Sequence, residues 1–145
     1  MKPKIVIALA GNPNSGKTTI FNKLTGARQH VGNYPGVTVE RKEGHCRYGD
    51  MEMQIVDLPG TYSLTAYSTE ELVARNFLID EKPDVVVDII DASNLERNLY
   101  LAVQLMELGV PLVLAFNMSD QARAQGHEFD IEKLSSYFGA SIVQT

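Results

Sequence analysis

The sequence predicts a three-layer α/β fold in which a mostly parallel sheet is covered by helices on both faces. Apolar strand patterns alternate with helical patterns along the chain, which is typical of parallel α/β sheets. Polar groups also follow three of the predicted strands directly, at the sheet edge where open α/β folds bind ligands. With 145 residues, 44% of them hydrophobic, the chain (1–145) is expected to form one domain around one core.

The first predicted element is a buried strand over residues 5–10, an apolar run with β-branched side chains. A helix follows, because Ile20, Phe21 and Leu24 have the spacing of one helical face. Residues 27–37 contain glycine, proline and asparagine as breakers and are expected to form a loop.

The next two strands are expected to form an antiparallel hairpin, the one exception to the parallel sheet. Residues 37–48 and 51–56 flank the tight Gly49-Asp50 turn. Leu72, Phe77 and Leu78 are the expected core contacts of the helix that follows. The remaining expected elements are helices over residues 70–79, 94–108 and 130–138 and strands over residues 85–91, 111–116 and 141–145.

Charge and cysteine content narrow the function classes. The net charge of -5 argues against a nucleic-acid-binding surface. Cys46 is the only cysteine, so neither an internal disulfide nor a cysteine-based zinc site is expected. The start leads straight into a strand without a secretory signal, and no apolar run approaches the ~20 residues that cross a bilayer. This chain by itself is therefore expected to be soluble.

The phosphate-binding pattern G-x-x-x-x-G-K-[ST] matches Gly11-Asn12-Pro13-Asn14-Ser15-Gly16-Lys17-Thr18, between the first strand and the first helix. Glycines let such a loop bring its N–H groups close to phosphate oxygens, and the helix points its positive end at the same anion. Lys17 is then expected to reach the β- and γ-phosphates of a nucleotide, and the Thr18 hydroxyl to bind Mg²⁺.

A D-x-x-G motif, Asp57-Leu58-Pro59-Gly60, ends the second strand of the hairpin. An aspartate at this place beside a phosphate loop is able to hold Mg²⁺ through a water molecule. The Gly60 N–H is expected to meet the γ-phosphate, because only glycine lets the backbone come so close. The motif alone also fits an ordinary turn, but its position after a phosphate loop favours the nucleotide role.

An N-x-x-D motif, Asn117 and Asp120, follows the strand over residues 111–116. An aspartate carboxylate accepts two hydrogen bonds from guanine, from N1–H and the 2-amino group, whereas adenine offers no such donor pair. The alternative is a helix-capping turn in which Ser119 or Asp120 is the cap. The order of the three motifs favours recognition of guanine.

The same order of motifs is found in Ras-like small GTPases. The stretches GNPNSGKTTIFNKLTGARQHVGNYPGVTVERKEG, VDLPGTYSL and DASNLERNLYLAVQLMELGVP resemble, over almost the whole chain, the cytosolic GTPase (G) domain of the bacterial ferrous iron transport protein B family. The resemblance implies a P-loop NTPase fold that binds GTP and GDP with Mg²⁺ and hydrolyses GTP slowly, with stimulation by K⁺. It further implies a nucleotide switch at the cytoplasmic side of the inner membrane, attached to helical regulatory and membrane domains and coupled to Fe²⁺ uptake.

The resemblance also assigns residue roles. Thr38 matches the switch I threonine that binds Mg²⁺ and senses the γ-phosphate, and Asn14 matches an asparagine that holds K⁺ against the phosphates in place of an arginine finger. Residues 27–38 and 58–69 would be the switch segments. The catalytic residues implied are Asn14, Lys17, Thr38 and Gly60. Nucleotide contacts are implied for residues 11–18, Thr19, Gly36, Val37, Thr38, Asp57, Leu58, Pro59, Gly60, Asn117, Met118 and Asp120.

The chain departs from the common GTPase pattern at three positions. Thr61 follows Gly60 where Ras-like enzymes carry the glutamine that positions water. Met118 replaces the lysine of N-K-x-D, as is usual in this family. We therefore expect a lower affinity for nucleotide and fast release of GDP. Asp88 stands in an apolar strand where the family more often has asparagine, and it needs a partner, solvent or the nucleotide nearby.

The chain also ends before two features of the fold. It is expected to lack the fifth, Ser-Ala-like motif and the final helix, so that one sheet face is open to self-association. The alternatives to an iron-transport GTPase are a ribosome-assembly GTPase of the Era or Obg kind, a nucleotide sensor without hydrolysis, and an ATP-specific P-loop enzyme.

Overall fold

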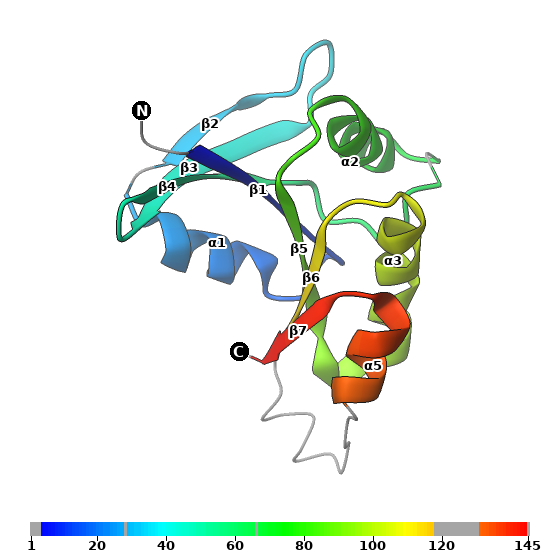
Figure 1. The fold of residues 1–145 in the computed structure, drawn as a ribbon. Helices are drawn as coiled ribbons and strands as arrows, with labels where there is room; N and C mark the ends of the chain where they lie inside the picture. The colour runs from blue at the N-terminus through cyan, green and yellow to red at the C-terminus, as the bar shows by residue number, and fades with distance from the viewer. Residues whose placement is uncertain (1–3, 28, 66, 118–130, 145) are drawn as a thin grey trace.

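A seven-stranded sheet forms the centre of the molecule in the computed structural model, which describes residues 4–27, 29–65, 67–117 and 131–144 (Figure 1). The strand order is β2-β3-β4-β1-β5-β6-β7. Strand β3 runs antiparallel to both of its neighbours, and all other pairs are parallel. The strands are β1 Lys4–Gly11, β2 Gln29–Asn33, β3 Glu40–Tyr48, β4 Met51–Asp57, β5 Val85–Asp91, β6 Leu112–Asn117 and β7 Ser141–Gln144.

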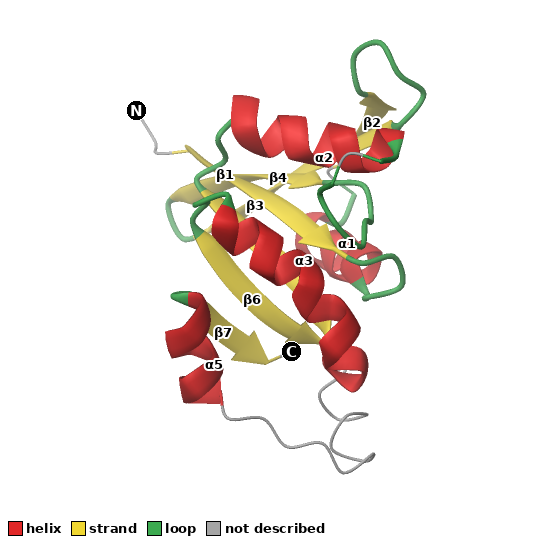
Figure 2. Cartoon of the chain, turned by 90° about the vertical axis from the view of Figure 1, so that its right-hand side faces the viewer, coloured by secondary structure: helices red, strands yellow, loops and turns green. Residues whose placement is uncertain are grey.

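Helices cover both faces of this sheet. In Figure 2, α2, α3 and α5 lie in front of the strands and α1 lies behind them. The three-layer α/β fold with a single antiparallel strand is therefore confirmed. The helices are α1 Lys17–Thr25, α2 Thr69–Asp80, α3 Leu95–Glu107, which a 3₁₀ turn over Ala92–Asn94 precedes, and α5 Ile131–Phe138.

Alternating residues of β1 separate the two layers of the core. Ala8 packs in the cluster that contains Phe77 of α2 and Leu101 of α3, whereas Leu9 packs with Phe21 of α1. Phe21 is completely buried, and such a side chain contributes about 1.5–3 kcal/mol of transfer free energy. The period-2 alternation of β1 thus fixes α1 and the α2–α3 pair on opposite faces, with the loop after β1 between them.

Three details of the sequence prediction were wrong. Residues 29–33 form the edge strand β2 rather than part of a loop, and β3 begins at Glu40 rather than Val37. All residues of β2 are exposed, with Val31 53% exposed, so no hydrophobic alternation marks the strand; its pairing comes from the backbone of β3. Leu72 is exposed on α2, while Phe77 and Leu78 reach the core as expected.

Among the helices in the described part of the chain, none combines the length and the apolar character needed to cross a membrane.

Asp88 lies in the middle of β5, between Ala10 of β1 and Leu114 of β6. Its side chain is 1% exposed, and its Oδ2 atom has no hydrogen-bond partner among the described residues. Burial raises the pKa of this carboxyl well above its usual range. Of the three expected environments for Asp88, solvent is ruled out by its burial, and no described residue supplies a partner to Oδ2.

Replacing Asp88 with asparagine is expected to stabilise the chain at neutral and higher pH. The folded chain keeps a proton that the unfolded chain loses above about pH 4, so stability falls as pH rises toward the raised pKa of Asp88. Asp88→Asn removes this titration and should raise the free energy of unfolding by about 1 kcal/mol at pH 8. Urea denaturation at pH 4 and pH 8 measures the effect, with Asp50→Asn in the exposed turn as the control. A gain of equal size at both pH values would contradict the explanation.

Candidate functional site

The loop between β1 and α1 is the centre of the candidate site. Asn14 and Gly16 have positive φ angles of 70° and 92°, and the Ser15 N–H donates to the Asn12 carbonyl at 3.2 Å. A Cβ at Gly11 would lie 2.8 Å from the Ile89 carbonyl oxygen and 2.8 Å from Ser15 Oγ, so only glycine fits there. The chain therefore turns tightly at the carboxyl end of the central strand.

A cavity of about 530 Å³ opens on this loop and on the first turn of α1. It lies at the N-terminus of α1, where free N–H groups and the helix dipole favour an anion. This is the arrangement that the phosphate-binding pattern predicts. The lining residues are Asn12, Pro13, Asn14, Gly16, Lys17, Thr18, Thr19 and Gly60.

Lys17 and Asp57 form a buried ion pair at one wall of the cavity. Lys17 Nζ donates to Asp57 Oδ1, and the two side chains are 9% and 6% exposed. In these buried surroundings of low dielectric, each charge is stabilised by the opposite charge of its partner, because burying an unpaired charge costs free energy. The pair brings the predicted phosphate-binding lysine and the aspartate of the D-x-x-G motif to one point.

A second cavity, of about 340 Å³, adjoins the first and shares Lys17, Thr18 and Gly60 with it. These two are called the phosphate-side cavities below. Thr38 and Asp57 also line this cavity, so the three predicted Mg²⁺ ligands meet in one place. Hydroxyl and carboxylate oxygens suit Mg²⁺, which usually takes few protein ligands and completes its shell with water and phosphate. Within the described ranges, no group of three or more His, Cys, Asp or Glu side chains that could hold a metal ion occurs.

The D-x-x-G segment is docked against the phosphate loop by its backbone. The Leu58 N–H donates to the Leu9 carbonyl at 3.0 Å, and the Thr61 N–H donates to the Gly11 carbonyl at 3.0 Å. A Cβ at Gly60 would lie 3.2 Å from Pro13 Cα. The absence of a side chain at residue 60 therefore allows two loops to approach more closely than another residue would permit.

Glu71 organises the segment after Gly60, a role that the sequence analysis did not assign. Its carboxylate accepts hydrogen bonds from Ser63 Oγ, Thr65 Oγ1 and the Tyr67 N–H at 3.0, 3.1 and 2.9 Å. Burial acts to raise the pKa of Glu71, but these bonds together outweigh it and lower the pKa. The Glu71 N–H also donates to Ser68 Oγ, which caps α2. The S-x-x-E spacing of Ser68 and Glu71 is the sequence signal that predicts such a cap.

Tyr34 anchors the segment that carries Thr38. Its side chain is 6% exposed, its N–H donates to the Val39 carbonyl at 3.0 Å, and its carbonyl accepts from the Val37 N–H at 3.3 Å. Burial raises the pKa of Tyr34 to about 12, although the Arg41 charge acts to lower it, so the hydroxyl stays neutral. This loop is therefore held by an aromatic side chain in the core.

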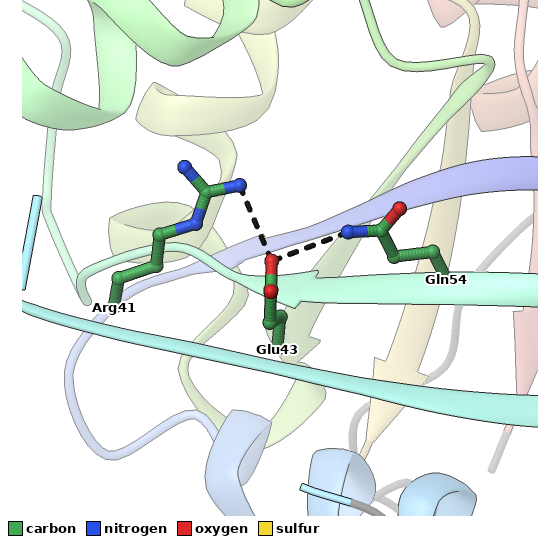
Figure 3. Close-up of polar contacts among 3 residues, drawn as sticks. All are labelled: Arg41, Glu43 and Gln54. Carbon is green, nitrogen blue, oxygen red and sulfur yellow. Dashed lines mark hydrogen bonds and ion pairs between the residues drawn. The ribbon is translucent and has the colours of Figure 1, made fainter. Parts of the chain in front are cut away.

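Arg41 connects the Tyr34 anchor to the sheet. Its guanidinium lies 5.5 Å from the centroid of the Tyr34 ring and 5.7 Å from that of Phe77. Figure 3 shows how Glu43 fixes this arginine: Glu43 Oε2 accepts from Arg41 Nη2 at 3.2 Å and from Gln54 Nε2 at 3.2 Å. The contacts link β3, β4 and α2 beside the segment that carries Thr38.

The predicted base-recognition motif is described only in part. Asn117, at the end of β6, donates through Nδ2 to the Ser15 carbonyl at 3.1 Å and so ties the motif to the phosphate loop. Met118, Ser119 and Asp120 lie outside the described residues. Gly36 and Val37 are described but do not line either of the two cavities. All of the expected nucleotide contacts, those of Gly36, Val37, Met118 and Asp120 included, remain predictions.

Comparison with known proteins places this site in a family. The family model for ferrous iron transport protein B matches residues 5–145. The chain is 55% identical, over 142 residues, to the Fe(2+) transport protein A/Fe(2+) transporter FeoB fusion protein of Porphyromonas gingivalis, covering 97% of this chain and 17% of that protein. The chain thus spans less than a fifth of the length of this relative.

Solved structures agree with the sequence match. The cytosolic domain of the T. maritima FeoB iron transporter in a GDP form superposes with a TM-score of 0.94 at 41% identity, covering 99% of this chain and 56% of that one. The GMPPNP form of the same domain gives a TM-score of 0.93 at 42% identity, covering 97% of this chain and 56% of that one. The resemblance seen in the sequence is confirmed, and the chain belongs to the ferrous iron transport protein B family.

Proposed function

We propose that this chain is a G domain that binds GTP and GDP with Mg²⁺ and hydrolyses GTP to GDP and phosphate. The observation that carries the proposal is the meeting of Lys17, Thr18, Thr38, Asp57 and Gly60 around two adjoining cavities at the phosphate loop. Support also comes from the T. maritima domain, whose structures are of GDP and GMPPNP forms. These residues come from three separate segments of the chain. If the loop after β1 were only a tight turn that binds no ligand, there would be no reason for them to converge on it.

In this proposal the loop amides and Lys17 bind the phosphates, and the Gly60 N–H donates to the γ-phosphate. Thr18 and Thr38, with Asp57 through a water molecule, would hold Mg²⁺, which neutralises charge on the β- and γ-phosphates when it is bound. Water attacks the γ-phosphorus in line with the bond to GDP, which leaves as the second product. Catalysis then depends on positioning and electrostatic stabilisation, and the intrinsic rate is slow because Thr61 replaces a water-positioning glutamine.

Asn14 is the proposed ligand of K⁺. It is exposed, lines the cavity at the phosphate loop and has a positive φ of 70°. A cation there would stand where an arginine finger acts in other GTPases.

Replacing NaCl with KCl is therefore expected to raise the rate of phosphate release at least about tenfold. Asn14→Ala should remove the difference between the two salts, whereas Asn22→Ala on the exposed side of α1 should keep it. Phosphate release is measured with saturating GTP and Mg²⁺ in each salt. Equal rates in both salts would refute the K⁺ role. No phosphate release in either salt would support the alternative function, a nucleotide sensor that does not hydrolyse GTP.

Asn117 and Asp120 are proposed to select guanine. Displacement of a fluorescent GDP analogue by GTP but not by ATP tests this role, and Asp120→Ala should lose the discrimination. With Met118 in place of lysine, stopped-flow release of GDP should take seconds rather than minutes. A preference for ATP would support the ATP-specific alternative.

For the whole protein we propose a switch role in Fe²⁺ uptake. Residues 27–38 and 58–69 would order around the γ-phosphate and relax after hydrolysis. Downstream helical and membrane domains would receive that change at the cytoplasmic side of the inner membrane. The names of the relatives and the small share of their length that this chain covers support this view. The family match does not favour a ribosome-assembly GTPase.

A further inference from the structure

A small polar cavity lies between the phosphate loop and the start of α3. Its volume is about 90 Å³, and its lining includes Asn12, Asn14, Tyr62 and Arg97. These residues come from the phosphate loop, the segment after Gly60 and α3. The cavity therefore marks a place where three parts of the molecule touch outside the phosphate-side cavities.

Arg97, in the first turn of α3, contacts both of the other parts. Its carbonyl oxygen accepts a hydrogen bond from Asn12 Nδ2 at 3.4 Å. Its guanidinium lies over the ring of Tyr62, 4.5 Å from the ring centroid. At a partly exposed site such a cation–π contact is worth about 0.5–1 kcal/mol, enough to change a local equilibrium severalfold.

The two partners of Arg97 stand next to the proposed reaction centre. Tyr62 follows Thr61, whose N–H donates to the Gly11 carbonyl at 3.0 Å, and lies two positions after Gly60. Asn12 is 4% exposed, and its Oδ1 has no described partner, so the Arg97 carbonyl is the contact that orients its carboxamide. One residue of α3 thus contacts both of the loops that are proposed to face the γ-phosphate.

We propose that Arg97 is a positioning residue for GTP hydrolysis. Its stack on Tyr62 holds the segment around Gly60 against the phosphate loop, and its carbonyl holds Asn12 in the same unit. The inference rests on the proposed GTPase function. Because neither Arg97 nor Tyr62 lines the phosphate-side cavities, the contact acts on the alignment of the reacting groups rather than on the binding of nucleotide.

Steady-state hydrolysis by five variants and one control tests the proposal. Arg97→Ala and Tyr62→Leu should each lower kcat by about two- to fivefold, with KM for GTP within about 1.5-fold. Tyr62→Phe keeps the ring and should keep the activity, and Arg97→Lys keeps the cation and should recover part of it. The double variant, Arg97→Ala with Tyr62→Leu, should be no slower than either single one. The control is Arg75→Ala, an exposed arginine of α2.

Several outcomes would overturn the proposal. They are Arg97→Ala with the same kcat as Arg75→Ala, Tyr62→Phe as slow as Tyr62→Leu, multiplied effects in the double variant, or a change confined to KM. Thermal unfolding of each variant identifies any that fails to fold, in which case the two conservative variants decide.

A fluorescence measurement tests the contact independently of hydrolysis. The chain contains no tryptophan, so Tyr62→Trp places a single indole under Arg97. Adding Arg97→Ala in that background should shift its emission and remove the difference between the GDP and GMPPNP states, and an unchanged spectrum would refute the stack. If the wild-type chain binds no GDP, the proposed GTPase function is wrong. Failure of the Arg97 proposal and failure of the proposed function therefore give different results.

Discussion

Lys17→Ala is expected to lower the affinity for GTP by about 10- to 150-fold and to reduce hydrolysis below detection, because a charge-assisted bond to phosphate contributes about 1.5–3 kcal/mol. Lys17 lines both phosphate-side cavities and is the cationic side chain that they share. Titration calorimetry with GTP and Mg²⁺ measures the affinity. Lys23→Ala, on the exposed side of the same helix, is the matched control and should bind as the wild type does.

The same substitution has a second effect, on stability. Removal of Lys17 leaves the Asp57 carboxylate buried and unpaired, which should lower the free energy of unfolding by about 3 kcal/mol. Combining it with Asp57→Asn removes the stranded charge and should recover most of the stability but none of the binding. If the single variant binds GTP within about threefold of wild type, Lys17 is a structural partner of Asp57 only.

Much of the site could be predicted because its chemistry lies in consecutive residues. The phosphate loop needs glycine, lysine and threonine at fixed spacing directly after a strand, and the structure places Gly11, Lys17 and Thr18 around one cavity. The hairpin and the helices were likewise predicted by turn residues and by hydrophobic periodicity. Local signals of this kind survive in any sequence that folds this way.

Contacts between distant segments were not accessible in the same way. The strand β2 has no buried side chain, so nothing in its own residues shows that β3 will pair with it. The stack of Arg97 on Tyr62 likewise joins residues whose approach depends on where α3 begins relative to the phosphate loop. From the sequence, Tyr34 was expected to be an ordinary residue of the loop over residues 27–37, but it is buried in the core. Such features follow from tertiary packing, which local pattern does not encode.

Gly60→Ala is expected to separate binding from catalysis. The added Cβ would lie 3.2 Å from Pro13 Cα and 3.3 Å from Pro13 N, and a backbone neighbour cannot rotate away as a side chain does. Residue 60 must therefore move from the phosphate loop, and its N–H moves with it. GDP does not depend on this N–H, so its affinity should stay within about twofold, while hydrolysis of GTP should fall by about 10²-fold, the cost of a misplaced reacting group.

The control for this variant is Gly32→Ala in β2, where an added Cβ meets no atom within 4 Å. Single-turnover hydrolysis and GDP titration are measured for both variants. Hydrolysis by Gly60→Ala at the rate of Gly32→Ala would show that the close approach to Pro13 has no part in the reaction. A parallel loss of GDP affinity would show instead that the methyl group disturbs the whole phosphate loop. The expected result, loss of hydrolysis alone, would place the catalytic role in the distance between two backbones, which explains why the motif requires glycine.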